Sequence, residues 1–437
     1  MTYQETCEYL FNQLPMFEKQ GADGYKEGLA NSNALDKHFD HPHKKYLTIH
    51  VAGTNGKGSC AHTLSAILQM CGYKVGLYTS PHLVDFSERI RVNGQPISEA
   101  YVVDFVEKER SFFEPLHPSF FELTTAMAFN YFAEMDVDIA VIEVGLGGRL
   151  DCTNIITPIL SIITNIGMDH TQFLGTSLEQ IAMEKAGIIK KGVPVVIGET
   201  IPETRMVFEA IAGENQAPIT FAEDVKQVIS ASTSARGMEY HTKSFGIIKG
   251  ELNGSYQEKN ANTILCAVQQ LEAMGYMHAV KSEPHAQCQN REVRQAFAHV
   301  GDLTGLKGRW QKVGEAPLTI CDTGHNVPGW MYLSQQLKSV KCNHMHIVFG
   351  MVDDKDIQGV MDLLPQNATY YFTKANNKRA VSENVLKLYA QGKGLEGESY
   401  PDVKTAYDAA KGAAQINDFV FVGGSSYVVA ELLKNCI

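Results

Sequence analysis

The sequence predicts an α/β protein with two domains of unequal size. The chain has 437 residues, which is too long for one ordinary hydrophobic core. Short apolar strands alternate with helical segments along most of it, as in mostly parallel sheets covered by helices. A glycine-rich turn also joins an early buried strand to a helix. We therefore expect a P-loop-type, mostly parallel sheet domain with a small antiparallel sheet on its flank, and a smaller Rossmann-like α/β domain at the C-terminal end.

The glycine-rich turn, residues 53–58, predicts a phosphate loop. It follows an apolar run over 46–51 and precedes apolar residues that recur at helical spacing between 64 and 71. Glycines let backbone N–H groups close around a phosphate, and a helix N-terminus attracts anions. Lys57 adds a positive charge, and Ser59 can bind Mg²⁺. The spacing is a variant of the Walker sequence, so the motif alone also fits an ordinary turn that exposes a lysine.

The remaining elements of the first domain, residues 1–300, follow in order. We expect an amphipathic helix around Tyr9 to Phe17 and a loop through residues 22–33 before the phosphate loop. After it the pattern predicts strands over 74–79, 138–144, 159–164 and 193–197, half a hairpin at 88–94, and helices over 122–132 and 178–186. Residues 215–256 lose the alternation, which predicts short antiparallel strands, and helices near 257–274 and 291–300 close the domain.

The alternation restarts in the second domain, residues 301–437. Four apolar runs predict its strands, at 318–321, 346–349, 369–372 and 419–422, with helical segments between them. Two polar clusters accompany these strands. Arg309, beside a tryptophan, can clamp a phosphate or stack on a base, and Asp322 can accept hydrogen bonds from ribose hydroxyls. Taken singly, each is more often a surface loop residue.

Polar residues also follow successive strands of the first domain. Ser80, Glu143 and His170 each come at the end of a predicted strand, and the carboxyl ends of parallel strands lie at one edge of a sheet. With Ser59 they offer hydroxyl, carboxylate and imidazole groups to a divalent ion, and Mg²⁺ prefers oxygen ligands. The spacing alone leaves a structural histidine and a paired buried acid open as alternatives.

Two further segments are ambiguous. Residues 145–151 imitate a dinucleotide fingerprint, but Leu150 occupies the third glycine position and no helical pattern follows. A loop that lets a substrate approach the metal is the better interpretation. Lys185 closes a helix, where a lysine usually caps the negative end of the helix dipole.

Composition and charge exclude several classes of protein. Hydrophobic residues make up 44% of the chain and charged residues 20%, as in globular enzymes. The net charge of −11 argues against a nucleic-acid surface, which needs clustered Lys and Arg. No apolar run is long enough to cross a bilayer, and the first residues, Met1 to Leu14, are too polar for a signal peptide. We expect a cytoplasmic protein that binds neither nucleic acid nor membrane.

Eight segments resemble the motifs of the folylpolyglutamate synthase and dihydrofolate synthase family of the Mur ligase superfamily, and they occur in the same order as in that family. They are residues 52–59, 79–83, 143–151, 169–170, 184–187, 308–310, 322–326 and 424–427. There are two departures from the family pattern. Gly324 stands in place of the usual alanine of a D-x-A-H-N segment, and Tyr256 stands where a histidine is frequent.

The resemblance implies an ATP-dependent ligase that joins L-glutamate to the carboxylate of a pteroate or folate through an acyl phosphate, releasing ADP and phosphate. The residues implied to bind ATP are Thr54, Asn55, Gly56, Lys57, Gly58, Ser59, Asn260, Arg309 and Asp322. Those implied to hold one or two Mg²⁺ ions are Ser59, Ser80, Glu143, His170 and Lys185, with Lys185 a candidate for carbamylation. The implied catalytic residues are Lys57, Asp151, Lys185 and His325, and the implied substrate contacts are Pro81, His82, His325 and Ser425.

The partners expected from the resemblance are small molecules, namely dihydropteroate or folate, L-glutamate and ATP, and the expected state is a monomer. The first alternative is another Mur-type amide ligase that acts on a different carboxylate. A P-loop kinase or GTPase would instead transfer phosphate to a hydroxyl or to water. A nucleotide-binding module without catalytic activity is the third alternative.

Overall fold

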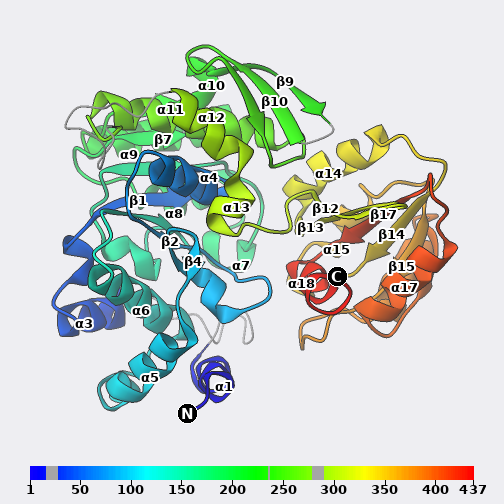
Figure 1. Ribbon diagram of the computed structural model, residues 1–437, viewed down its shortest axis with the longest axis horizontal. Coiled ribbons are helices and arrows are strands. Elements are labelled where there is room, and N and C mark those ends of the chain that lie inside the picture. Colours follow the sequence, from blue (N-terminus) through cyan, green and yellow to red (C-terminus); the bar gives the residue numbers. More distant parts are fainter. Residues whose placement is uncertain (16–27, 235–236, 278–289) are drawn as a thin grey trace. The chain divides into compact units, whose positions relative to one another are not determined.

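The computed structural model describes residues 1–15, 28–234, 237–277 and 290–437, and these form two compact units (Figure 1). The first unit contains Met1–Glu251 and Gln257–Leu306, and the second contains Leu252–Tyr256 and Lys307–Ile437. The chain therefore passes between the units three times. The predicted boundary at residue 300 falls at the start of α13 (Val300–Thr304), which packs on α4 (Lys57–Met70) within the first unit.

An eight-stranded, mostly parallel sheet forms the centre of the first unit, in the order β4-β3-β2-β5-β1-β6-β7-β8. Only β3 and β4 run antiparallel to their neighbours, and they form the predicted hairpin. The strands are β1 (Leu47–Ala52), β2 (Val75–Tyr78), β3 (Ile90–Val92), β4 (Gln95–Pro96), β5 (Ile139–Glu143), β6 (Leu160–Ile163), β7 (Val195–Ile197) and β8 (Ile219–Phe221). The predicted fold class is confirmed.

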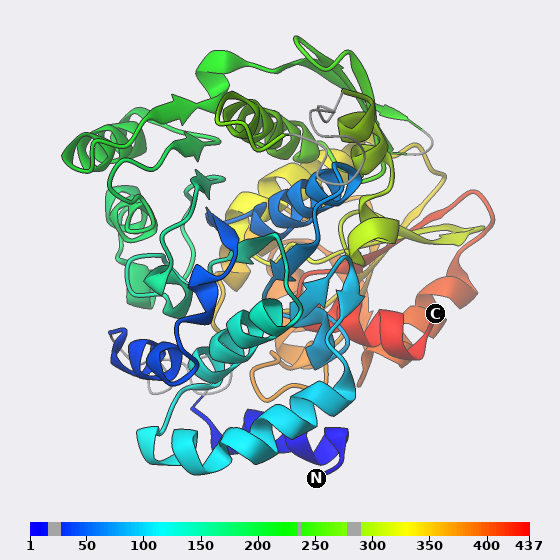
Figure 2. The same ribbon diagram turned by 60° about the vertical axis from the view of Figure 1, so that its left-hand side comes forward.

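Helices cover both faces of this sheet (Figure 2). Because successive side chains of a strand point to opposite faces, Ile139 and Val141 of β5 join the core under α4, whereas Ala140 and Ile142 join the core under α6. Besides α4, the longer helices are α1 (Tyr3–Gln13), α3 (Ala30–His38), α5 (Glu99–Phe113), α6 (Phe120–Glu134), α8 (Leu178–Ala186), α9 (Pro202–Glu214), α11 (Gln257–Ala273) and α12 (Asn290–Ala298). The shorter ones are α7 (Thr171–Leu174), α10 (Ala222–Val225) and the 3₁₀ turns η2 (Pro42–Lys44), η3 (Phe86–Arg89), η4 (Glu114–Leu116) and η5 (Cys152–Ile155).

The predicted flanking antiparallel sheet contains β9 (Val228–Ser234), β10 (Gly237–Thr242) and β11 (Ile247–Gly250), in the order β11-β10-β9. It packs against α11 and α12. The sequence predicted antiparallel strands from residue 215, but β8 pairs in parallel with β7 at the edge of the main sheet.

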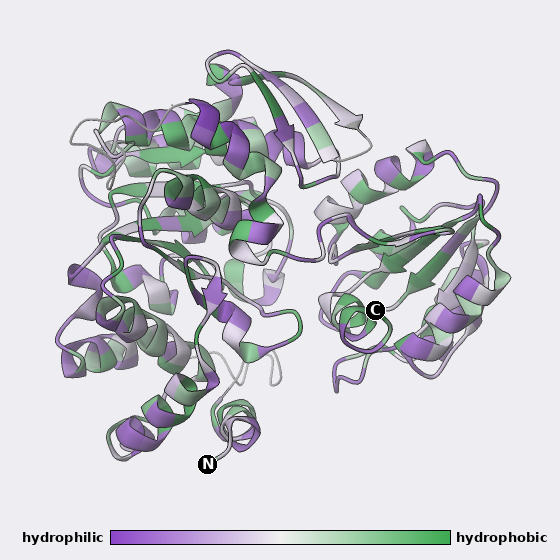
Figure 3. Cartoon of the chain, in the orientation of Figure 1, coloured by the Kyte–Doolittle hydropathy of each residue, from purple (hydrophilic) through white to green (hydrophobic). Residues whose placement is uncertain are grey.

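The second unit has a six-stranded sheet in the order β12-β13-β17-β14-β15-β16, in which only β12 is antiparallel. Its central strands are strongly hydrophobic, as Figure 3 shows. The strands are β12 (Gln311–Glu315), β13 (Leu318–Asp322), β14 (Met345–Phe349), β15 (Thr369–Phe372), β16 (Glu396–Ser399) and β17 (Phe419–Gly423). The helices are α14 (Val327–Ser339), α15 (Ile357–Met361), α16 (Glu383–Gln391), α17 (Val403–Ala413) and α18 (Ser426–Asn435).

Near the N-terminus, a predicted helix begins earlier than expected and a predicted loop contains a helix. Helix α1 begins at Tyr3, because Thr2 and Glu5 form a capping box, and it ends at Gln13; the part of the predicted helix beyond residue 15 lies outside the described residues. Helix α3 begins at Ala30, inside the predicted loop, and buries Leu35. Among the helices of the described residues, none is long and apolar enough to span a membrane.

Candidate active site

The predicted phosphate loop connects β1 to α4 at the centre of the sheet. Gly56 is the N-cap of α4 and has a φ of +83°, a conformation that favours glycine. A Cβ atom at this position would also overlap Oδ1 of Asn260, on α11. The loop and Asn260, about 200 residues apart in the sequence, are therefore in direct contact.

The loop is braced by the segment after β6. The Thr54 N–H donates to Asn165 O at 3.0 Å, and the Asn55 N–H donates to Asn165 Oδ1 at 2.9 Å. The Thr164 hydroxyl donates to Asn55 O at 2.5 Å, and the Thr54 hydroxyl lies 3.0 Å from the N–H of Gly167. These bonds fix the loop conformation, which leaves the first N–H groups of α4 at the N-terminal end of the helix.

Two lysines meet at one carbonyl oxygen of the loop. Lys57 Nζ and Lys185 Nζ each lie 3.0 Å from Gly53 O, and Lys57 also contacts Thr54 O at 3.2 Å. Lys185 is only 4% exposed. Burial, together with repulsion from Lys57, lowers the pKa of Lys185 to about 7, so a large share of its amine is neutral at neutral pH. Lys185 is thus part of the phosphate-loop site and not a solvated helix cap.

Ser59 is 1% exposed, and its hydroxyl accepts a hydrogen bond from Gln257 Nε2 at 3.3 Å. Gln257 Oε1 accepts in turn from Asn260 Nδ2 at 2.9 Å. The first turn of α11 therefore contacts the phosphate loop at two points, Ser59 and Gly56.

Ser80 and Glu143 lie together at the carboxyl ends of adjacent strands. The backbone N–H of Ser80 donates to Glu143 Oε2 at 3.4 Å, and Glu143 is 4% exposed. The Ser80–Pro81 peptide bond is cis. A buried carboxylate beside a serine suits a cation.

His82, two residues after Ser80, accepts a hydrogen bond at Nδ1 from Arg89 Nε, at 2.7 Å. Burial, assisted by the positive charge of Arg89, lowers the pKa of His82 to about 3. The ring is therefore neutral and carries its proton on Nε2.

His170 follows β6 and has a left-handed backbone, with φ of +50°. Its neighbour Asp169 raises the pKa of Lys185, against the larger effect of burial, which places Asp169 near that amine. In the described part of the chain, no three His, Cys, Asp or Glu side chains form a group that could hold a metal ion. The predicted ligand set is instead built mainly from hydroxyls and a lysine, with Glu143 and His170.

The Asp151 carboxylate is buried and holds the loop that follows β5. It accepts hydrogen bonds from the N–H groups of Leu146 and Thr153 at 2.9 and 3.0 Å, and from the Thr153 hydroxyl. Burial raises the pKa of Asp151, and these hydrogen bonds oppose the shift. The loop ends in η5, not in a helix that would bind a dinucleotide.

In the second unit, Asp322 ends β13 and is 3% exposed. Its Oδ2 accepts from the Tyr256 hydroxyl at 2.6 Å and from the Trp310 N–H at 2.7 Å, and its Oδ1 accepts from the Gly324 N–H at 2.8 Å. Burial raises the pKa of Asp322, again opposed by hydrogen bonds. Tyr256, one of the two departures from the family pattern, therefore contacts a predicted nucleotide residue.

Arg309, His325 and Ser425 lie at the same carboxyl end of this sheet. Arg309 Nη1 donates to the Thr323 hydroxyl, and His325 Nδ1 lies 3.0 Å from Thr323 O. Ser425 follows β17, the strand that pairs with β13, and its hydroxyl caps α18 by accepting from the Tyr427 N–H at 3.2 Å.

The other departure, Gly324, packs against helix α14. A Cβ atom on Gly324 would overlap Cδ1 of Leu333 on α14. An alanine at this position would therefore need the end of the Leu333 side chain to move.

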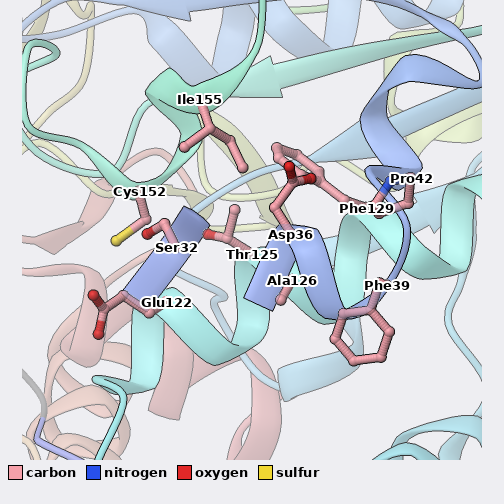
Figure 4. A pocket seen from close by; sticks show the side chains of 10 residues that line it. All are labelled: Ser32, Asp36, Phe39, Pro42, Glu122, Thr125, Ala126, Phe129, Cys152 and Ile155. Carbon is pink, nitrogen blue, oxygen red and sulfur yellow. The ribbon is translucent and has the colours of Figure 1, made fainter. Parts of the chain in front are cut away.

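A small pocket lies between α3, α6 and η5 in the first unit, lined by side chains that include Ser32, Asp36, Thr125 and Cys152 (Figure 4). It is just large enough for a water molecule. Such a pocket cannot hold a nucleotide or a pterin.

The structure adds contacts by four residues that the sequence did not assign to the site. Asn165 and Gln257 brace the phosphate loop, Arg89 fixes the tautomer of His82, and Tyr256 donates to Asp322. Arg89 stands in a segment already singled out as a hairpin, but no spacing rule connects it with His82. The other three act across large sequence separations.

Two family models match the chain, the Mur ligase middle domain over residues 51–268 and the glutamate ligase domain of Mur ligases over residues 308–426. The dihydrofolate synthase/folylpolyglutamate synthase of Bacillus subtilis is 33% identical, over 99% of this chain and 98% of the relative.

Solved structures show the same likeness. The Escherichia coli FolC complex with DHPP and ADP has a TM-score of 0.81 and 30% identity, over 99% of this chain and 97% of that one. A bifunctional folylpolyglutamate synthase/dihydrofolate synthase with Mn, AMPPNP and L-glutamate bound has a TM-score of 0.80 and 30% identity, over 99% and 98% of the two chains. The fold and the relatives agree: the chain belongs to the folylpolyglutamate synthase/dihydrofolate synthase family of ATP-dependent ligases.

Proposed function

We propose that this enzyme phosphorylates the carboxylate of dihydropteroate or a folate with ATP and lets the α-amine of L-glutamate displace the phosphate. A carboxylate is a poor electrophile, and the acyl phosphate supplies a leaving group. The products are the amide, ADP and phosphate. The observation that carries the proposal is the convergence of Lys57 and Lys185 on Gly53 O at the head of α4.

The phosphate loop is assigned to the ATP phosphates. Residues 56–59 form the N-cap and first turn of α4, whose N–H groups would bind a phosphate at the N-terminal end of the helix. Lys57 would exchange its two loop carbonyls for phosphate oxygens and stabilise charge on the transferring group. The proposal also assigns Thr54, Asn55 and Asn260 to the nucleotide, and Arg309 and Asp322 in the second unit.

Mg²⁺ fits the chemistry of the residues assigned to it. Ser59, Ser80 and the buried Glu143 carboxylate supply the oxygen ligands that Mg²⁺ prefers, and His170 completes the protein ligands. The ion would neutralise phosphate charge when bound. The relative with Mn bound supports a divalent ion, and the proposal names Mg²⁺ as that ion and allows for a second.

Lys185 is assigned as a carbamylated metal ligand. Carbamylation needs a neutral amine, and the pKa of about 7 supplies one. It would convert a buried cation, which Lys57 repels, into an oxygen ligand. Mass measurement of intact protein after rapid trapping of carbamate as a methyl ester tests this: an unmodified Lys185 would refute it.

The substrate contacts remain as predicted. Pro81 and His82 are assigned to the pteroate, with His82 Nε2–H as the donor, because Arg89 occupies Nδ1. His325 and Ser425 are assigned to the glutamate and to the attack of its amine. Asp151 is assigned to the catalytic centre of the first unit.

The test measures ADP release from ATP, Mg²⁺, dihydropteroate and glutamate. We expect ADP formation to require both dihydropteroate and glutamate. Mass spectrometry of the product should show one added glutamate. ADP release that does not depend on any amine would favour a kinase or a GTPase instead. Replacing dihydropteroate with folates decides whether the enzyme has one activity or both. The proposal retains a monomeric state and a cytoplasmic location, and light scattering of the purified protein tests the first.

A further inference from the structure

A buried hydrogen-bond chain runs from the central strand to the loop after Glu143. His50, on β1, is fully buried, and its Nε2 lies 2.8 Å from the Thr153 hydroxyl. That hydroxyl donates to Asp151 Oδ1. Asp151 Oδ2 then accepts from the backbone N–H of Leu146, three residues after Glu143.

The positions of the protons determine which group donates and which accepts in each of these hydrogen bonds. A hydroxyl carries one proton, and an ionised carboxylate only accepts. Because Thr153 gives its proton to Asp151, its oxygen accepts the proton of His50 Nε2. In the opposite direction, His50 would carry its proton on Nδ1, which is buried and has no hydrogen-bond partner, and Asp151 would have to be protonated. The hydrogen-bond chain therefore ends on the Asp151 carboxylate, which accepts at both oxygens.

The same turn also ties the loop to α8. Asn154 Nδ2 donates to Arg149 O and to Gly187 O, both at 3.0 Å. The Arg149 N–H donates to Glu184 O at 2.7 Å. Lys185 lies between these attachment points, so one rigid turn holds both the loop behind Glu143 and the end of the helix that carries Lys185.

We propose that His50 and Thr153 are positioning residues, which keep Asp151 bonded to the loop and thereby hold Glu143 and Lys185 in place for the metal. The inference rests on the proposed function, in which these two residues are metal ligands. It gives Asp151, which the proposed function places in the catalytic centre, a positioning role through the backbone of Leu146. Residues that orient metal ligands in this way commonly change metal affinity by about 10- to 100-fold when they are replaced.

The test compares Thr153→Ser, Thr153→Val and the double variant His50→Leu/Thr153→Val. Serine keeps the hydroxyl and valine removes it at similar volume, while the double variant leaves no buried donor without a partner. The measurement is Mn²⁺ binding to the enzyme–ADP complex, with the melting temperature recorded for each variant. We expect Thr153→Ser to bind Mn²⁺ within about threefold of wild type, and both valine variants to bind it about tenfold more weakly or worse. The double variant should melt within about 3 °C of wild type.

Several outcomes would overturn the inference. The first is wild-type Mn²⁺ affinity in the double variant. The second is the same loss of Mn²⁺ affinity in Thr153→Ser as in Thr153→Val. The third is a double variant that binds Mn²⁺ weakly and also melts more than about 3 °C below wild type. If the valine variants do not fold, His50→Gln, which keeps a donor, is compared with His50→Leu, and equal Mn²⁺ affinity of the two refutes the inference. Wild-type enzyme that makes no glutamylated product would instead refute the proposed function.

Discussion

Lys185→Met should make the ligand-free protein more stable and inactive. The amine is buried beside Lys57 and donates to Gly53 O. Methionine has a similar length, carries no charge and fills irregular space well. The change therefore removes a desolvated positive charge without opening a cavity.

The magnitude follows from the pKa of Lys185, which is about 7 in the folded protein and 10.5 ordinarily. Between these pH values the unfolded chain binds a proton that the folded protein lacks. The free energy of unfolding should thus rise by about 1.4 kcal/mol per pH unit from pH 7 upward, and the full penalty of about 5 kcal/mol applies below pH 7. The lost hydrogen bond offsets about 1 kcal/mol. We expect Lys185→Met to be more stable than wild type by about 3 kcal/mol at pH 7, and the difference to shrink toward pH 10.

The assay is urea denaturation of both proteins between pH 6 and 9, without ATP or metal and in buffers freed of CO₂, since a carbamate would remove the charge. Buried cysteines and tyrosines titrate equally in both proteins, so the difference isolates Lys185. A variant that is less stable than wild type at pH 7, or a difference that stays constant with pH, would refute the reasoning.

Three further substitutions test the site. Gly56→Ala forces a side chain into a left-handed position and onto Asn260, so it should weaken ATP binding, measured by calorimetry, and cost about 1–2 kcal/mol of stability; unchanged ATP affinity would contradict the loop assignment. Lys57→Ala should lower kcat by about 100- to 1000-fold with an unchanged melting temperature. A fully active variant would instead favour a nucleotide-binding module without catalytic activity. Tyr256→Phe removes one of three donors to Asp322 and should cost about 1–2 kcal/mol in urea denaturation, whereas a neutral effect would show that the hydroxyl is dispensable.

Hydrophobic periodicity located the buried strands and the helices that cover them. The strand over 369–372 was predicted to the residue, and the three other predicted strands of the second unit were within one residue at each end. The strands β12 and β16 were missed because they lie at the edges of the sheet, where polar and half-exposed residues erase the apolar signal. Similarly, α3 was not predicted because its sequence is mostly polar. Its buried face is defined only by its packing on α6.

The sequence by itself predicted the α/β fold class, the glycine-rich loop between β1 and α4 and the polar residues at strand ends, because each of these depends on local spacing. Only the tertiary structure decided that Lys185 shares a carbonyl with Lys57, that Asn260 touches Gly56, and that His50, Thr153 and Asp151 form one directed chain. The physical reason is that burial and hydrogen-bond direction depend on neighbours that packing brings together from distant parts of the chain. A lysine at a helix end looks like a cap in the sequence, and becomes a half-neutral amine only once the fold excludes water from it.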